Sequence, residues 1–409
     1  MMRASDSTAS PEVADEGRSR LRGRAAGGAP DVALVAPFPP PGERHGGWTG
    51  VASYAANLAG ALGDAGARVT VIAPREPGLP AVVREGPVEV RRSWRRGPGA
   101  LPAAVAAARS TGAPAVHLQH ELFLYGGPAA APGIVPALAA LRAERRGAVV
   151  TMHHVVAPAA VDRHFVRTHG VRAPAPVARA AVAGLQHAVG ALADRVVVHE
   201  PSFAGVVPGA TVVPHGIEAP TVATRAAARA ALGVDPDATL AVCFGFVAPY
   251  KGLETALDAA RLAGVKLVVA GGPHPRHDRA YADALQATAP PDVRFTGFVP
   301  DADVGRWFAA ADVALLLYPR PFASSGPLAL ALAHRTPVLM SEALAATTGA
   351  PPGLAVPRGS AALAERLREL AADPAAGALL RERAATMAAG RGWPDVARRH
   401  LELYEGVPA

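Results

Sequence analysis

Three loops in this 409-residue chain combine glycine or proline with polar side chains just before a helical pattern. Glycine lets the backbone approach a ligand closely, and the N-terminus of a helix offers free N–H groups to a phosphate. We therefore expect an anionic ligand at these loops, with a flexible turn for the first and simple helix capping for the third as alternatives. The loops are residues 40–50 with Gly46 and Gly47, residues 245–252 with Phe246 and Lys251, and residues 321–328 with Ser324, Ser325, Gly326, Pro327 and Leu328.

Lys251 is one of only two lysines among 41 basic residues, and it follows an expected strand. A point charge at this place can neutralise a diphosphate. At the start of a helix a cation also adds to the positive end of the helix dipole, which an anionic ligand would relieve. The sequence thus favours a phosphate-binding role for Lys251 over a solvated lysine.

Four histidines, His120, His153, His154 and His215, stand at the ends of expected strands. Two of these strands belong to one sheet, so their terminal side chains should converge on the same edge. We expect at least one of the four to contact the ligand or support the transition state. A zinc site is disfavoured because no metal-ligand spacing repeats.

Short β-branched runs alternate with longer Ala/Leu-rich helical patterns, which is typical of βαβ units and parallel sheets. Helices are expected near 50–65, 133–145, 176–193, 253–262, 279–288, 303–310, 327–333 and from 360 onward. Strands are expected at 31–37, 68–74, 115–121, 148–155 and 195–200, with 212–216 closing the first half, and then at 240–247, 266–271, 293–298, 312–318 and 337–341.

This order predicts an α/β protein of two doubly wound, Rossmann-like domains. The expected parts are a disordered tail at 1–30, a first domain at 31–220, a polar linker at 221–237, a second domain at 238–388 and a terminal helix at 389–409. Two wound sheets in tandem place the carboxyl ends of their strands on opposite sides of a cleft, where ligands bind.

Composition excludes some classes of protein. Apolar residues make up 50% and charged residues 18%, as in ordinary globular proteins. The net charge of +7 follows from a general arginine bias, and no aromatic-interleaved basic stripe indicates nucleic-acid binding. The basic cluster Arg91, Arg92, Trp94, Arg95 and Arg96 is expected to be a solvated face, with an anionic lipid or acceptor as the alternative.

The chain has a single cysteine, Cys243, and therefore no internal disulfide. Neither a signal-peptide core nor a clean membrane span is present in the sequence. We expect a cytoplasmic protein, with peripheral contact at the inner membrane face left open.

Taken together, the motifs resemble those of glycosyltransferase family 4, the retaining glycosyltransferases of the GT-B fold. The resemblance covers roughly residues 31–405, and the order and spacing of the motifs are more specific than any one of them. The stretches that carry it are Gly46-Gly47-Trp48-Thr49-Gly50-Val51, His117-Leu118-Gln119-His120-Glu121, Tyr125-Gly126-Gly127, Val149-Val150-Thr151-Met152-His153-His154, Val213-Pro214-His215-Gly216-Ile217, Tyr250-Lys251-Gly252, Val269-Ala270-Gly271-Gly272, Ala310-Ala311-Asp312-Val313 and Gly392-Trp393-Pro394-Asp395-Val396.

The resemblance implies transfer of a hexose-type sugar from a nucleotide diphosphate sugar, with UDP or GDP as the nucleotide, to a hydroxyl acceptor. The acceptor class stays open between a glycan, a lipid carrier and a natural product. The resemblance implies no cofactor and no metal, and it does not indicate the oligomeric state. It also implies that the terminal helix crosses back to the first domain. In this scheme His120 contacts the donor sugar beside the reacting carbon and Lys251 holds the diphosphate. The expected donor-binding set is completed by Gly46, Gly47, His153, His215, Phe246, Ser324, Ser325, Gly326, Pro327 and Leu328.

Three positions depart from the family pattern. Phe246 stands where an arginine is usual, and Phe322 and Leu330 stand where two glutamates are usual. The second glutamate normally binds the ribose, so ribose recognition must differ here, with Ser324 and Ser325 as partial substitutes. These losses keep open a catalytically silent nucleotide-sugar-binding or scaffold protein. A sugar-nucleotide epimerase is a weaker alternative because carboxylates are sparse in the motifs.

Overall fold

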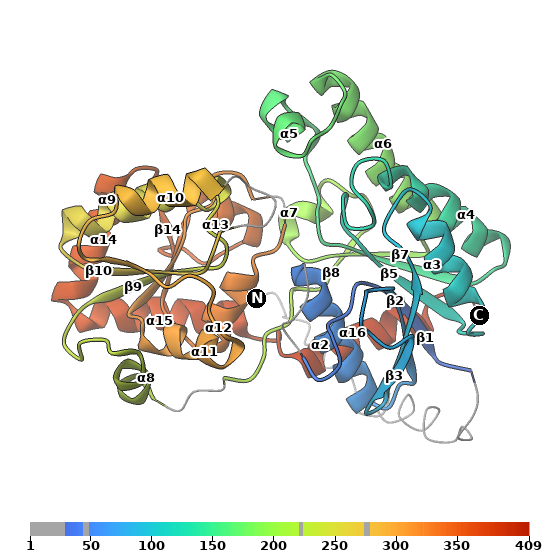
Figure 1. Ribbon diagram of the computed structural model, residues 1–409, viewed down its shortest axis with the longest axis horizontal. Helices are drawn as coiled ribbons and strands as arrows, with labels where there is room; N and C mark the ends of the chain where they lie inside the picture. Colours follow the sequence, from blue (N-terminus) through green and yellow to red (C-terminus); the bar gives the residue numbers. More distant parts are fainter. Residues whose placement is uncertain (1–28, 44–48, 221–223, 274–278, 322, 409) are drawn as a thin grey trace, which may run out of the picture.

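The computed structural model describes residues 29–43, 49–220, 224–273, 279–321 and 323–408. Two α/β lobes lie side by side, each built on one twisted sheet with helices on both faces (Figure 1). The sequence prediction of an α/β chain with two doubly wound domains is therefore confirmed. The exact limits of the domains stay a prediction.

The first sheet has the strand order β3-β4-β2-β1-β5-β6-β7-β8, and only the β3–β4 pair is antiparallel. The order reverses between β1 and β5, which is the switch point where ligands bind in such sheets. The strands are β1 (Val32–Val35), β2 (Val69–Pro74), β3 (Val82–Glu85), β4 (Val88–Trp94), β5 (Ala115–His120), β6 (Gly147–Met152), β7 (Arg195–Val198) and β8 (Thr211–Val212).

The three helices predicted for the first lobe are present, but a further ten-residue helix at Ala100–Arg109 and several short ones were not predicted. Both β1 and β5 are completely buried, as expected for strands covered by helices on both faces. The helices are α2 (Gly50–Asp64), α3 (Ala100–Arg109), η1 (Ala131–Gly133), α4 (Ile134–Ala143), η2 (Pro158–Ala160), α5 (Arg163–Thr168), α6 (Ala175–Leu192) and α7 (Pro201–Ala204).

The second sheet is wholly parallel in the order β11-β10-β9-β12-β13-β14, so its switch point lies between β9 and β12. Its strands are β9 (Leu240–Phe244), β10 (Lys266–Ala270), β11 (Val293–Phe295), β12 (Val313–Leu316), β13 (Val338–Ser341) and β14 (Ala355–Val356). Its helices are α8 (Arg225–Leu232), η3 (Pro249–Lys251), α9 (Leu253–Ala263), α10 (Arg279–Ala287), α11 (Asp301–Ala310), α12 (Gly326–Ala333), α13 (Glu342–Thr348), α14 (Ser360–Ala372) and α15 (Pro374–Ala388).

The basic cluster at 91–96 is only in part the solvated face expected from the sequence, because Arg91, Arg95 and Arg96 are exposed whereas Arg92 and Trp94 are buried. It lies on β4, whose side chains alternate between buried and more exposed positions because successive residues of a strand point to opposite faces. Arg92 is 4% exposed and donates to the carbonyl oxygens of Phe38 and Pro39 at 3.3 and 2.6 Å. Trp94 is also buried and donates to the Ile72 carbonyl. Arg92 therefore holds the start of the loop after β1.

The stretch 221–237, expected to be a linker, contains helix α8, which packs against α11 of the second lobe. Arg229 anchors it: this side chain is buried and donates to the Ala310 carbonyl at 2.9 Å and to the Asp312 carboxylate at 2.7 Å. Alanine and arginine richness alone gave no sign of this contact. Beyond residues 221–223, which lie outside the described residues, the stretch belongs to the second lobe.

The last helix, α16 (Trp393–Glu405), returns to the first lobe and packs against α2 (Figure 1). The chain crosses beside the outgoing segment, where Ile217 N donates to the Arg391 carbonyl at 2.8 Å. Trp393 then covers Gly216 so closely that a Cβ there would lie 2.5 Å from the indole ring. The two crossings between the lobes are thus packed together.

Helix α9 begins after Gly252 and ends before Gly264, and both glycines have left-handed backbones with φ of 67° and 68°. A Cβ at Gly252 would lie 2.4 Å from the Leu317 carbonyl oxygen, whereas one at Gly264 would meet no atom within 4 Å. The two positions therefore differ in steric contact but not in backbone conformation.

We expect Gly264→Ala to lower the free energy of unfolding by about 1–2 kcal/mol, the cost of a left-handed alanine. Gly252→Ala should cost at least about 2 kcal/mol more, because the end of β12 must move to relieve the clash. Thermal unfolding of both variants by calorimetry measures the difference. Equal losses in the two variants would mean that Gly252 is not in close contact with Leu317.

Candidate functional site

The second and third loops lie next to each other because they follow β9 and β12, the neighbouring strands at the switch point of the second sheet. Gly245 has a left-handed backbone, and a Cβ on it would lie 3.1 Å from Lys251 Nζ and 3.7 Å from Pro327 Cγ. The structure therefore brings together Lys251 and the start of α12, which the sequence had placed 75 positions apart.

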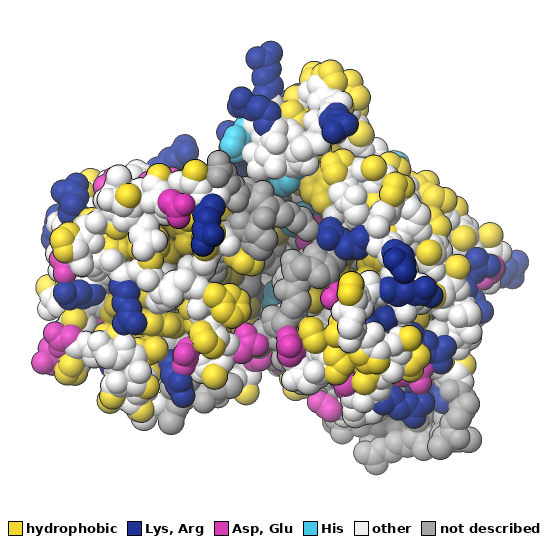
Figure 2. Space-filling model, in the orientation of Figure 1, with side chains coloured by type: hydrophobic (Ala, Val, Ile, Leu, Met, Phe, Trp, Pro, Cys, Tyr) yellow, Lys and Arg dark blue, Asp and Glu magenta, His cyan; other side chains and the backbone are white. Residues whose placement is uncertain are grey.

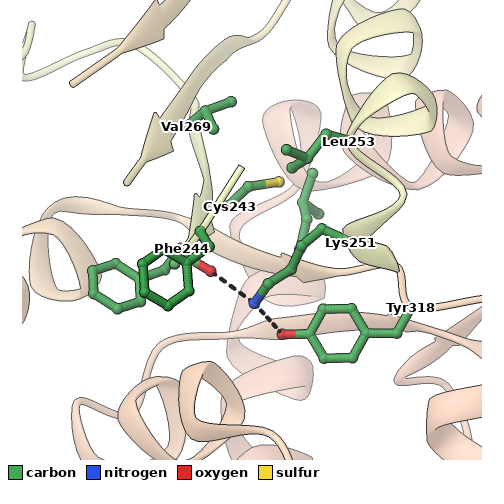
Figure 3. Close-up of a pocket in the computed structure, with 9 residues that line it drawn as sticks. Cys243, Phe244, Lys251, Leu253, Val269 and Tyr318 are labelled. Atoms are coloured by element: carbon green, nitrogen blue, oxygen red, sulfur yellow. Dashed lines mark hydrogen bonds between the residues drawn. The ribbon is translucent and has the colours of Figure 1, made fainter. Parts of the chain in front are cut away.

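Lys251 is not a solvated lysine: its side chain is 9% exposed. Its ammonium donates to the Phe244 carbonyl oxygen at 3.3 Å and to the Tyr318 hydroxyl at 3.0 Å (Figure 3). It also lies 4.8 Å from the centre of the Tyr318 ring, within the range of a cation–π interaction. Burial alone would lower the pKa of Lys251, but Tyr318 and Tyr250 raise it above the ordinary value, so the group stays charged.

The cavity directly around Lys251 holds about 10 Å³, room for roughly one water molecule. Cys243, Phe244, Leu253 and Val269 form its apolar side (Figure 3). Burial raises the pKa of the Cys243 thiol to about 12, so this cysteine is a packing residue. A ligand as large as a diphosphate must therefore lie at the mouth of this cavity rather than inside it.

In the third loop, Ser325 is the N-cap of α12 and accepts a hydrogen bond from Leu328 N at 3.1 Å. Its hydroxyl also lies 3.1 Å from the Tyr318 hydroxyl, which completes a polar path from Lys251 through Tyr318 to the helix start. The expectation that the amides of Gly326, Pro327 and Leu328 all face a phosphate needs a correction. Proline has no N–H and the Leu328 N–H is already bonded to Ser325, so within the described chain only the Gly326 N–H is left for a ligand.

The positions that depart from the family pattern are apolar in the structure as well. Leu330 packs against the core of the second lobe, and Phe246 is 43% exposed at the start of the second loop. Phe322, like Gly46 and Gly47 of the first loop, lies outside the described residues. The Leu330 side chain cannot accept a hydrogen bond from a ribose hydroxyl.

The third loop also reaches the first lobe. Ala323 forms an isolated antiparallel bridge with His154, and Arg320 pairs with Asp162 at 2.6 Å. Helix α7 of the first lobe contacts α13 of the second. These contacts bring the carboxyl ends of β6 and β7 against the loop after β12, so residues from both lobes surround the third loop.

His120 ends β5 at the switch point of the first sheet and is 1% exposed. Neither of its ring nitrogens has a hydrogen-bond partner in the described part of the chain. Burial, with a smaller contribution from His154, lowers the pKa of His120 to about 4, so the ring is neutral at physiological pH. A buried imidazole with both nitrogens free is costly unless a ligand completes its bonds.

His153 has both ring nitrogens engaged. Its Nε2 lies 2.8 Å from Gln119 Oε1 and its Nδ1 lies 3.3 Å from His199 Nε2. His199 in turn bonds the Val213 carbonyl at 2.9 Å. His153 therefore belongs to a buried hydrogen-bond network in the sheet. Its contact with a donor stays a prediction, and such a contact would replace one of these two hydrogen bonds.

His215 also has a structural environment. Its Nδ1 lies 2.8 Å from the Gly216 carbonyl oxygen, and its ring packs edge-on to Tyr54 and Trp393. Burial lowers the pKa of His215. The His215 side chain thus packs where the chain leaves the first lobe and where α16 returns to it.

Glu200, which follows β7, is a candidate that the sequence analysis missed. It is 1% exposed, and its Oε2 has no hydrogen-bond partner among the described residues. Burial raises the pKa of Glu200 to about 7. Arg391 and Ser324 have the opposite, smaller effect, and the Ser324 hydroxyl forms no regular hydrogen bond with Glu200. The available signal was its place at a strand end, the same signal that singled out His120.

The face of the molecule in Figure 2 does not gather its basic side chains in one place. On the face shown in Figure 2, lysine and arginine side chains are scattered over both lobes. Among the described residues, no three His, Cys, Asp or Glu side chains form a group that could hold a metal ion. No helix in the described ranges has the length and apolar character needed to cross a membrane.

The pKa of Glu200 gives a test of its burial. Because the folded protein raises this pKa from 4.5 to about 7, the contribution of Glu200 to stability is complete below pH 4.5 and is lost as the pH rises through 7. Glutamine carries no charge at any pH. We therefore expect Glu200→Gln to gain up to about 3 kcal/mol in stability relative to wild type between pH 5 and pH 8.

Unfolding midpoints of both proteins across this pH range measure the effect. The buried His120 and His199, whose lowered pKa values act in the opposite direction, are present in both proteins and cancel in the difference. A difference that does not change with pH would contradict the burial of Glu200.

Comparisons with known proteins fit this architecture. Residues 238–373 match the family model described as glycosyl transferases group 1. A D-inositol 3-phosphate glycosyltransferase of Kineococcus radiotolerans is 33% identical over 222 residues, which cover 47% of this chain and 51% of that protein. The match thus spans about half the length of this curated relative.

Among solved structures, sucrose-phosphate synthase from Thermosynechococcus elongatus superposes with a TM-score of 0.70 at 22% identity, covering 91% of this chain and 98% of that one. HepE from Anabaena, solved in complex with UDP-glucose, superposes with a TM-score of 0.64 at 17% identity, covering 92% and 99%. Residues 238–373 therefore match the glycosyl transferases group 1 family, and the described chain as a whole has the GT-B fold.

Proposed function

We propose that this protein is a glycosyltransferase that moves a hexose-type sugar from a nucleoside diphosphate sugar to a hydroxyl acceptor, with retention at the anomeric carbon. The observation that carries the proposal is the placement of the Lys251 ammonium beside the start of α12 at the switch point, joined through Tyr318 and Ser325. The group 1 match over the same domain supports it.

Lys251 is arranged to hold a phosphate oxygen. An ammonium has three N–H donors, and two are directed at the Phe244 carbonyl and the Tyr318 hydroxyl. The third is available to a diphosphate at the mouth of the cavity, next to the Gly326 N–H. As the glycosidic bond breaks, negative charge grows on the leaving diphosphate, and a fixed cation and N–H dipole aimed at it lower the barrier. In this proposal these groups make a divalent metal unnecessary.

His120 would act on the donor sugar from the opposite lobe. Its neutral ring has both nitrogens free, and the loop that carries Ser324 is held against the neighbouring strand end by the His154–Ala323 bridge. A neutral imidazole can donate one hydrogen bond and accept another, which suits sugar hydroxyls near the reacting carbon. The leaving diphosphate would then assist front-face attack by the acceptor hydroxyl.

The nucleotide is proposed to be UDP, with GDP as the alternative. HepE, which shares the fold, was solved with UDP-glucose. The apolar Leu330 removes the usual carboxylate contact to the ribose, so binding energy must come mainly from the diphosphate and the sugar. The acceptor would bind on the first lobe, as a glycan, a natural product or a lipid carrier, and only the last would require contact with the inner membrane face.

Thermal shift against UDP, GDP and their sugars tests the donor site. A ligand at about 100 times its dissociation constant should stabilise the wild type by about 2.7 kcal/mol. Lys251→Ala should lose most of this stabilisation because it removes the charge that faces the diphosphate. Lys266→Ala is the matched control, since it removes the only other lysine, which is exposed and paired with Asp292.

A shift with one nucleotide sugar that is lost only in Lys251→Ala, together with release of the nucleoside diphosphate when acceptors are supplied, supports the proposal. No shift with any nucleotide would refute it. Saturable binding without turnover across acceptors would instead identify the silent binding protein.

His120 has a separate expected effect. His120→Ala should lower kcat at least about 100-fold, because its contacts strengthen as the sugar becomes electron-poor, and should change donor affinity only a few-fold. The control is His164→Ala, an exposed histidine on α5. Initial rates and donor titrations separate the two parameters. A large loss of affinity with unchanged kcat would mean that His120 only binds the donor.

A further inference from the structure

A second cavity lies between the lobes, where α7 contacts α13. Its volume is about 330 Å³, at the lower end of the range usual for small-molecule sites. His199 and Pro201 line it from the first lobe, Thr348 and Gly349 line it from the second, and Arg391 and Arg399 line it from the returning chain. None of these residues belongs to the donor site proposed above.

The described lining contains two cations and no carboxylate. Arg391 and Arg399 are both half-buried, and neither guanidinium has a hydrogen bond or an ion pair to another residue in the described ranges. The Arg399 guanidinium lies over the crossing segment, where a Cβ on Gly390 would be 3.4 Å from its Nη2. Arg229 shows the contrast, because its buried guanidinium bonds to carbonyls and to Asp312.

Arg399 adds to the electrostatic cost of burying the charge of Arg391. Burial lowers the pKa of Arg391 and the nearby Arg399 lowers it further, while Glu200 raises it. Glu200 does not line the cavity, and with a pKa of about 7 it is only partly charged near neutral pH. Two guanidiniums in a partly dehydrated site favour a doubly charged anion, which each can bind with paired N–H donors.

We propose that this cavity binds the phosphate group of a phosphorylated small molecule, with Arg391 and Arg399 as its cationic contacts. The volume exceeds that of a phosphate ion, so the rest of the ligand would lie against Thr348 and Thr386, whose hydroxyls can still accept hydrogen bonds. Both lobes and the crossing segment form the walls. A bound ligand would therefore hold the lobes in the arrangement seen here.

Isothermal titration of the full-length protein with glucose 6-phosphate, inorganic phosphate and glucose tests the proposal. Both phosphates should bind and glucose should not. Arg391→Ala and Arg399→Ala should each weaken the binding of glucose 6-phosphate at least about tenfold, since each removes a charged hydrogen-bond partner. Arg399 lies on α16 and not in the crossing segment itself, so its variant should fold even where loss of Arg391 disturbs the crossing.

Arg398→Ala is the matched control on the same helix, because Arg398 pairs with Asp395 and Glu402 on the surface and does not line the cavity. It should bind like wild type. Absence of binding, or binding unchanged in both cavity variants, would overturn the proposal. So would binding that is lost in Lys251→Ala but kept in Arg391→Ala and Arg399→Ala, since that would place the phosphate in the donor site.

Discussion

The switch point of the second lobe is organised around the buried positive charge of Lys251. An ammonium that is 9% exposed is stable only if its donors find acceptors, and Lys251 finds them in the Phe244 carbonyl and the Tyr318 hydroxyl. Phe244 is the last residue of β9, and Tyr318 follows the end of the neighbouring strand β12. The lysine therefore links the ends of both strands. Through Tyr318 the same charge orients Ser325, and through Ser325 it sets the first turn of α12. One chain of hydrogen bonds that begins at Lys251 thus connects the second loop, the end of β12 and the start of α12.

The first lobe has a corresponding internal chain of hydrogen bonds. It runs from Tyr404 on α16 to His117 at 2.7 Å, from His117 to Gln119 at 3.1 Å, from Gln119 to His153 at 2.8 Å and on to His199 at 3.3 Å. Each of these imidazoles is buried, and burial lowers the pKa values of the histidines so that they remain neutral. A fully satisfied buried network specifies a unique arrangement of its members. The returning helix is therefore part of the interior of the first lobe and not an appended tail.

The sequence predicted the wound architecture well because buried parallel strands are continuous apolar runs, as in β5 and β9. It missed the β3–β4 hairpin because Arg92 and its neighbours were interpreted by charge, whereas their alternation of burial is a property of the strand. It singled out Lys251 and His120 because both residue types stand out at strand ends, and their roles stay predictions. It could not show that His153 is bonded on both sides or that Glu200 is buried, since these depend on partners such as His199 and Arg391 that only the folded chain brings near.

The same distinction explains what the unusual third loop does. Its usual glutamate positions are apolar or lie outside the described residues, yet the loop is not isolated: Ala323 bridges to His154, Arg320 pairs with Asp162, and Ser324 lies beside Glu200. All three partners come from the first lobe. A ligand at this loop would therefore meet residues of both lobes, and the same boundary carries the guanidinium groups of Arg391 and Arg399.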